Sequence, residues 1–266
     1  MTEVNHVISR DGTKIAVTRE GVGPGVVLVG GGLDDGAENA PLAAVLAERF
    51  TVVNYARRGR GGSSDSPLYA VEREVEDLAA VIEAAGGAAH VFGMSSGGAL
   101  VLEAAASGVP IISLAVYEVP FDMGADWPPL WRAYVERVSL AVAENRPDDA
   151  LELFMRLAET PAEEIVGLRA SPWWESLLAL APTLAHDAAC LGTGQPRRLA
   201  EITQPALVLT GDARYPGSPR WIRALDPAAD ALASGIASAR RGTLAGQSHT
   251  PDPGVLAPVL ADHFTS

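Results

Sequence analysis

The stretch that decides the fold runs from Ala89 to Ala106 and reads AHVFGMSSGGALVLEAAA. Its apolar first part predicts a buried strand, and the Ala-rich part that follows predicts a helix. Between the two, the run Gly93-Met94-Ser95-Ser96-Gly97 matches the pattern G-x-S-x-G. Glycines two before and two after the serine allow a strand to turn directly into a helix without a clash of Cβ atoms. The pattern therefore predicts Ser95 at the tip of a sharp turn, with a hydroxyl exposed for nucleophilic acyl chemistry.

The composition limits the classes to which the chain can belong. With 266 residues, 48% of them hydrophobic, it can bury a full core in one domain with an insertion. Its formal net charge of −13 argues against nucleic acids and anionic membranes as partners. The single cysteine, Cys190, excludes an intramolecular disulfide. We find neither a secretory leader nor an apolar run of membrane-spanning length, so we expect a cytoplasmic protein, monomeric or homodimeric, that acts on a small molecule.

Strand and helix patterns are spread along the rest of the chain. An Asp-Gly pair at 11–12 predicts a hairpin between the flanking apolar segments, at the edge of the sheet. Buried strands are expected over 26–29, a short apolar run, and over 111–116, and further strands over 51–55, 206–210 and 239–244. Helical periodicity indicates a helix over 71–85. Asp252, followed by Pro253, is expected to cap a terminal helix.

The segment from residue 121 to residue 198 differs from its surroundings. It has no strand-like run but several helix-start signals, among them a capping box over Thr160–Glu163. Four of the five tryptophans lie here. We therefore expect a helical cap over 121–198, inserted into a core formed by 1–120 and 199–266. Most of these aromatic side chains should pack the cap, and some should form an apolar wall of a substrate pocket.

The chain resembles the α/β-hydrolase family from about residue 10 to its end. The resemblance is carried by Gly30-Gly31-Gly32, Arg57-Arg58-Gly59-Arg60-Gly61-Gly62-Ser63, the turn at Ser95, Tyr117-Glu118-Val119-Pro120-Phe121 and Gly246-Gln247-Ser248-His249. It implies an α/β fold, with a mostly parallel, twisted sheet flanked by helices and an inserted helical cap. It is much less specific for the substrate, because this scaffold serves many reactions.

The resemblance also implies a catalytic triad in the order serine, acid, histidine. His249 follows the last expected strand and is the candidate base for Ser95. The identity of the acid is left open. The position at which the family usually carries an acidic residue falls near Arg214 and Tyr215, where there is no carboxylate. Glu118 is favoured, because some relatives carry their acid after the equivalent strand, and Asp212 is the alternative. A salt bridge to a loop arginine is the competing role of Glu118.

Two backbone amides are expected to bind the oxyanion. Matched to the family, these belong to Gly32 and Ser96, although Gly30 stands where the family usually has a histidine that braces this loop. We expect its loss to loosen the oxyanion hole. Arg57, Arg58 and Arg60, which follow the strand expected over 51–55, could form an anion-binding patch, but pairing with structural acids is the favoured interpretation. Residues expected to contact the substrate are Leu33, Met94, Phe121, Trp127 and Trp131.

These residues favour a serine hydrolase that cleaves an ester or lactone of a small apolar substrate through an acyl-enzyme. Serine in place of aspartate as nucleophile disfavours epoxide or haloalkane hydrolysis. One alternative is a biosynthetic thioesterase or cyclase-type enzyme. Another is a binding protein with a decayed site. Gly30 in place of the usual histidine, Ala56 where relatives often have an aspartate, and the missing acid near Arg214 argue for it. We expect no cofactor and no metal, because no cluster of histidines and carboxylates has ligand spacing.

Overall fold

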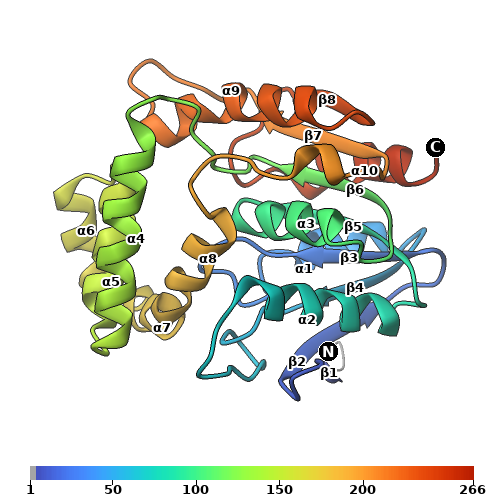
Figure 1. The fold of residues 1–266 in the computed structure, drawn as a ribbon, viewed down its shortest axis with the longest axis horizontal. Helices are drawn as coiled ribbons and strands as arrows, with labels where there is room; N and C mark the ends of the chain where they lie inside the picture. Colours follow the sequence, from blue (N-terminus) through green and yellow to red (C-terminus); the bar gives the residue numbers. More distant parts are fainter. Residues whose placement is uncertain (1–3) are drawn as a thin grey trace.

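An eight-stranded sheet forms the centre of the protein (Figure 1). The computed structural model describes residues 4–266, so the first three residues of the expected core lie outside the described part. The spatial order of the strands is β1-β2-β4-β3-β5-β6-β7-β8. The first three pair antiparallel, and from β4 to β8 all pairing is parallel. The strands are β1 (Val4–Ile8), β2 (Lys14–Glu20), β3 (Gly25–Val29), β4 (Thr51–Tyr55), β5 (Ala89–Met94), β6 (Ile111–Tyr117), β7 (Ala206–Gly211) and β8 (Ala239–Leu244).

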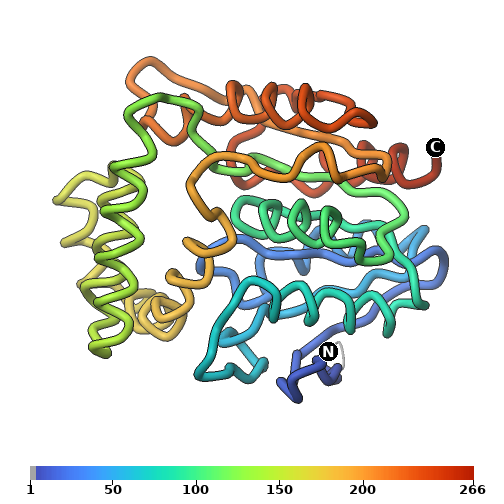
Figure 2. Tube along the Cα trace, in the orientation of Figure 1, coloured from blue at the N-terminus to red at the C-terminus, as the bar shows by residue number. Residues whose placement is uncertain are grey.

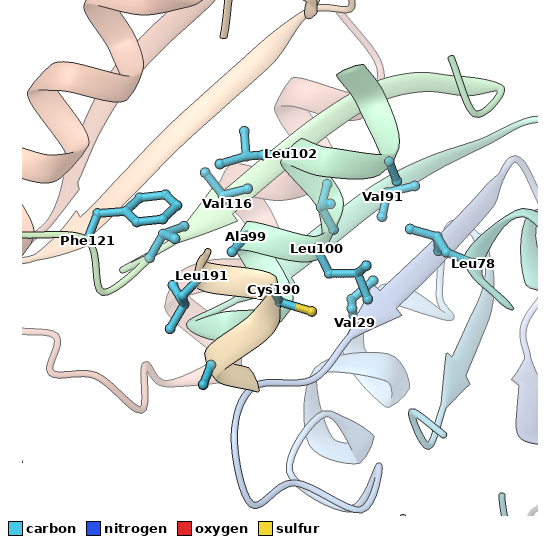
Figure 3. Packing of buried hydrophobic residues seen from close by; sticks show 14 of the residues in the cluster. Val29, Leu78, Val91, Ala99, Leu100, Leu102, Val116, Phe121, Cys190 and Leu191 are labelled. Carbon is cyan, nitrogen blue, oxygen red and sulfur yellow. The ribbon is translucent and has the colours of Figure 1, made fainter. Parts of the chain in front are cut away.

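Helices cover both faces of this sheet, which explains why the central strands are apolar along most of their length. One face packs against α2 (Val71–Ala84), α3 (Ser96–Ala106) and α9 (Arg220–Gly235). The other packs against α1 (Ala40–Leu46) and α10 (Pro253–Phe264). Figure 3 shows the first core, in which Leu100 of α3 lies close to Val29 and Leu78. The expected α/β fold is confirmed.

A group of helices is inserted between β6 and β7. Figure 2 shows the chain leaving the sheet after β6, forming this group to one side, and returning to β7. Its last helix, α8, packs against α3 of the core. The helices are α4 (Trp127–Ala143), α5 (Pro147–Leu157), α6 (Ala162–Arg169), α7 (Trp173–Leu180) and α8 (Leu184–Leu191), with short 3₁₀ turns at 181–183 and 199–201.

Two expectations about helix ends have different outcomes. Asp252 does cap α10, because its side chain accepts a hydrogen bond from the Gly254 amide. The capping box expected over Thr160–Glu163 is wrong. Pro161 occupies the N-cap position of α6 and makes no side-chain cap bond, so Thr160 lies one residue too early to serve. Within residues 4–266, no helix combines the length and the apolar character needed to cross a membrane.

Candidate active site

Ser95 occupies the turn between β5 and α3. Its backbone lies at φ 55° and ψ −128°, a conformation that costs energy for a residue with a side chain. The hydrogen bond from the Ser95 amide to the Tyr117 carbonyl, 2.9 Å, ties the turn to β6. A Cβ on Gly97 would come within 2.4 Å of the Gly30 carbonyl oxygen, so only glycine lets α3 begin this close to the loop after β3. The sharp turn predicted from the sequence is therefore present.

His249 lies in the loop after β8 and makes a hydrogen bond to Glu118. The distance from Nδ1 of His249 to Oε2 of Glu118 is 2.8 Å. Glu118 directly follows β6, has a positive φ of 47° and has a fully buried side chain. The ring of Trp221 meets the imidazole edge-on, with 4.9 Å between the ring centres. The imidazole is thus held by a carboxylate on its Nδ1 side and by an indole.

Glu118 is surrounded by hydrogen-bond donors. Its Oε1 accepts from the Gly211 amide at 2.9 Å and from the Arg214 guanidinium at 3.0 Å. Burial by itself raises the pKa of this carboxyl, but the bonds from His249, Gly211 and Arg214 outweigh burial and lower the pKa below its usual value. Glu118 is therefore ionised at neutral pH and accepts the Nδ1 proton. Its salt bridge is to Arg214, not to an arginine of the loop after β4.

Asp212, the alternative acid, has a different partner. It accepts a hydrogen bond of 2.5 Å from the Gly246 amide, in the turn that follows β8. Its carboxylate therefore stabilises the loop that leads to His249. Of the two candidate acids, the structure brings only Glu118 within hydrogen-bonding distance of the imidazole.

Ser95 and His249 line one cavity of about 300 Å³, which the inserted helices α4, α5 and α8 also line. Its wall is mostly apolar, and aromatic side chains from α4, α5 and α9 contribute to it. The lining comprises Gly31, Gly32, Glu38, Met94, Ser95, Ser96, Pro120, Trp127, Trp131, Tyr134, Phe154, Leu157, Ala158, Asp187, Ala188, Leu191, Trp221, His249 and Thr250.

Three of the five residues expected to contact substrate lie on this cavity, namely Met94, Trp127 and Trp131. Leu33 and Phe121 do not. Phe121 is buried in the core on the α3 side of the sheet (Figure 3), and Leu33 packs against the same core.

Asp187, Trp221 and Glu38 are among the cavity residues that sequence reasoning missed. Asp187 lies in the first turn of α8, Trp221 lies at the start of α9, and Glu38 precedes α1. None of them belongs to a motif, and each reaches the cavity only because its helix packs beside the site. Trp221 had one weak signal, as the single tryptophan outside the expected cap.

The loop of Gly30, Gly31 and Gly32 lies against Ser95. A Cβ on Gly31 would come within 2.9 Å of the Ser95 Cβ, and Gly32 and Ser96 both line the cavity. The loop has no histidine, yet its carbonyls are bound. Arg57 donates to the Gly30 oxygen at 3.5 Å, and Arg60 donates to the Gly31 oxygen.

The arginines of the loop after β4 are buried and paired with acids, as expected. Arg57 bonds Glu74 at 2.7 Å and Arg58 bonds Asp77 at 2.7 Å. Arg60 bonds Asp187 at 2.7 Å, and Arg57 bonds this same carboxylate. These side chains serve as buried cross-links beneath the site, not as an open anion site.

The other buried histidines are outside the cavity. His90 contacts Ser113, and the ring of His186 stacks on Tyr69 with 3.8 Å between ring centres. Over residues 4–266, histidine, cysteine and carboxylate side chains form no group of three or more able to hold a metal ion.

Comparison with known proteins places the chain in a family. The model of the alpha/beta hydrolase family matches residues 26–259. An alpha/beta hydrolase from Sphaerobacter thermophilus is 48% identical, with 98% of this chain and 100% of that chain covered and a TM-score of 0.86. No curated protein matches this chain.

More distant solved structures share the fold. An esterase from a Rhodococcus species is 19% identical, with 100% of this chain and 99% of that chain covered and a TM-score of 0.70. The enol-lactonase from Burkholderia xenovorans is 19% identical, with 98% and 100% covered and a TM-score of 0.72. The match over most of the sequence, together with the sheet order and the turn at Ser95, means that the chain belongs to the alpha/beta hydrolase family.

Proposed function

We propose that the protein is a serine hydrolase that cleaves the ester or lactone bond of a small, largely apolar substrate. One observation carries the proposal: Ser95, on a strained turn, and His249, bonded to the buried Glu118, line the same apolar cavity. A serine hydroxyl becomes a useful nucleophile when a neighbouring imidazole takes its proton. The paired imidazole and the half-buried serine on the cavity supply both parts.

The tautomer of His249 follows from its partner. Because the ionised Glu118 accepts at Nδ1, that nitrogen carries the proton of the neutral ring and Nε2 is left as the basic site. In the proposed mechanism, Nε2 takes the proton of Ser95 as its Oγ attacks the substrate carbonyl. The resulting imidazolium then protonates the leaving alcohol, and Glu118 stabilises the positive ring.

The negative oxygen that forms in this step needs donors. The amides of Gly32 and Ser96, from residues that both line the cavity next to Ser95, are the proposed donors. The Ser96 amide belongs to the first turn of α3, where N–H groups have no partner within the helix. A water activated by His249 then attacks the acyl-enzyme, releases the acid and restores Ser95.

The shape of the cavity supports the proposed substrate class. A volume of about 300 Å³ lies at the small end of the range of ~300–1,000 Å³ that is usual for ligand pockets, which fits a small substrate. Aromatic rings of Trp127, Trp131, Tyr134 and Phe154 favour an apolar acyl or alcohol group.

The experiment is turnover of p-nitrophenyl acetate and butyrate by the wild type and by Ser95→Ala. We expect wild-type turnover well above background and a loss of at least ~1,000-fold in the variant. Labelling with a fluorophosphonate should modify Ser95 and be abolished by the same substitution. Equal, background-level rates in both proteins would overturn the proposal and favour a binding protein with an inactive site.

A further inference from the structure

Asp187 connects the cap to the nucleophile turn. It lies in the first turn of α8 and is buried, yet its side chain reaches the core. Its Oδ1 accepts three hydrogen bonds, each of 2.7 Å, from Ser96 Oγ, Arg57 Nη1 and Arg60 Nη2. Ser96 is the residue whose amide is one proposed oxyanion donor. One carboxylate oxygen of the cap therefore holds this residue through its side chain.

The same two arginines hold the other side of the proposed oxyanion hole. Arg60 Nη1 donates to the Gly31 carbonyl while its Nη2 donates to Asp187. The Gly31 carbonyl and the Gly32 N–H belong to one planar, trans peptide group, so they point in opposite directions. A guanidinium that fixes this carbonyl therefore fixes the direction of the Gly32 N–H, the second proposed donor.

Further contacts make this cluster rigid. Arg57 lies 3.3 Å from Ser96 Oγ and 3.5 Å from the Gly30 carbonyl, so it bridges the two backbone segments. A Cβ built on Gly32 would come within 3.3 Å of Asp187 Oδ2, so the carboxylate lies directly against that glycine. Burial opposes ionisation of Asp187, but Arg60, Arg57 and the Ser96 hydroxyl hold its pKa below the ordinary value. The carboxylate is thus charged and matched to both guanidinium groups.

We propose that Asp187 is a positioning residue that aligns both oxyanion donors, Gly32 through Arg60 and Ser96 directly. The oxyanion hole is then complete only when α8 is seated on α3, so docking of the cap and catalytic competence are coupled. This inference rests on the proposed acyl chemistry at Ser95. It adds that a residue of the cap, 92 positions after the nucleophile in the sequence, contributes to stabilising the transition state.

The test compares Asp187→Ala, Asp187→Asn and Ser96→Ala with the wild type. Ser96→Ala removes the bonded hydroxyl and keeps the backbone amide. Cys190→Ala is the matched control, because Cys190 is buried in the same helix, contacts Arg57 at 3.3 Å and does not line the cavity. Each protein is assayed for kcat/KM with p-nitrophenyl butyrate. Each is also assayed for inhibition by an alkyl trifluoromethyl ketone and for binding of the methyl ketone of equal chain length.

The two ketones separate positioning from packing. The trifluoromethyl ketone adds Ser95 Oγ to its carbonyl carbon and places an oxyanion in the hole, whereas the methyl ketone binds without reacting. We expect Asp187→Ala to lower kcat/KM by ~10- to 100-fold, less than the ~10²- to 10³-fold cost of deleting a donor. The inhibition constant of the trifluoromethyl ketone should rise by a similar factor, with the methyl ketone changed by less than ~2-fold. Ser96→Ala and Asp187→Asn should show the same pattern at ~3- to 10-fold, and Cys190→Ala should match the wild type.

Each other result has a defined meaning. Equal weakening of both ketones, or wild-type kcat/KM in folded Asp187→Ala, would overturn the positioning role. If Asp187→Ala does not fold, Asp187→Asn and Ser96→Ala decide by the same comparison of ketones. Ser95→Ala separates the two proposals: wild-type turnover in Ser95→Ala removes the proposed function, whereas dependence on Ser95 with unchanged Asp187 variants removes only this inference.

Discussion

The hydrogen bond between His249 and Glu118 crosses a strand. Glu118 follows β6 and His249 follows β8, and β7 lies between these strands in the sheet. The carboxylate crosses the end of β7 at Gly211, whose amide it binds. A Cβ on Gly211 would come within 2.0 Å of the Gln247 carbonyl oxygen and 2.6 Å of the Tyr117 hydroxyl. The glycine therefore lets the loop carrying His249 come close enough for the pair to form.

This relationship predicts the effect of removing each candidate acid. Glu118→Gln should lower kcat by at least ~100-fold, because a neutral amide neither fixes the required tautomer nor stabilises the imidazolium. Asp212→Asn should lower it by less than ~10-fold, because Asp212 holds only the turn at Gly246. Steady-state kinetics with p-nitrophenyl butyrate measures both, and a larger loss in Asp212→Asn would contradict the assignment.

Acid should destabilise the protein partly through Glu74. This buried carboxylate bonds Arg57, and although burial opposes ionisation, the guanidinium lowers its pKa from 4.5 to about 2. Because the folded-state pKa is the lower one, the stabilisation is full above pH 4.5 and is lost as the pH falls towards 2. Between pH 6 and pH 3 the wild type should lose about 2 kcal/mol more free energy of unfolding than Glu74→Gln.

Urea unfolding of both proteins at each pH gives this difference. The variant has all the other carboxylates of the wild type, so their titration cancels in the comparison. Parallel pH curves for the two proteins would mean that the Arg57–Glu74 pair does not contribute to acid sensitivity.

Gly97→Ala should damage the site and the fold together. The new Cβ would meet the carbonyl oxygens of Gly30 and Val29 at 2.4 and 2.6 Å, and would push away the loop that carries Gly32. We expect a fall of at least ~10-fold in kcat and a lower melting temperature, in keeping with the cost of a misplaced oxyanion donor. Gly167→Ala in α6 is the control, because nothing lies within 4 Å of its Cβ position.

The control should stabilise the protein by about 0.5–1 kcal/mol, the usual gain of alanine over glycine inside a helix. Thermal unfolding followed by circular dichroism, together with the esterase assay, measures both variants. Wild-type kinetics in Gly97→Ala would show that the Gly30–Gly32 loop tolerates displacement.

Chain-length preference should depend on Leu157, which lines the cavity at the end of α5. Leu157→Ala enlarges the apolar space, so kcat/KM for p-nitrophenyl octanoate should rise at least ~3-fold relative to the butyrate, as expected from burying further methylene groups at ~0.8 kcal/mol each. Leu153→Ala, on the same helix but outside the lining, should leave the ratio of the two rates unchanged. A shift in both variants would indicate a general loosening of the cap.

The candidate catalytic residues and the fold class follow from local patterns in the sequence. G-x-S-x-G between an apolar run and an Ala-rich run identifies Ser95, because only a strand-turn-helix satisfies those glycines. His249 is found in the same way, from its place after the last strand. The sequence also supplies Glu118 and Asp212 as candidate acids and favours Glu118 only through the resemblance, because both follow apolar strands whose carboxyl ends share one edge of the sheet.

Only the tertiary structure decides that choice and the shape of the pocket. Glu118 reaches His249 because its backbone has a positive φ and because Gly211 leaves space, and both depend on how three strands align. Asp187 has no sequence signal, because its contacts with Arg60 and Ser96 join segments far apart in the chain. Periodicity and motifs report interactions within a few residues, whereas burial and pairing across the cap arise only when the helices pack.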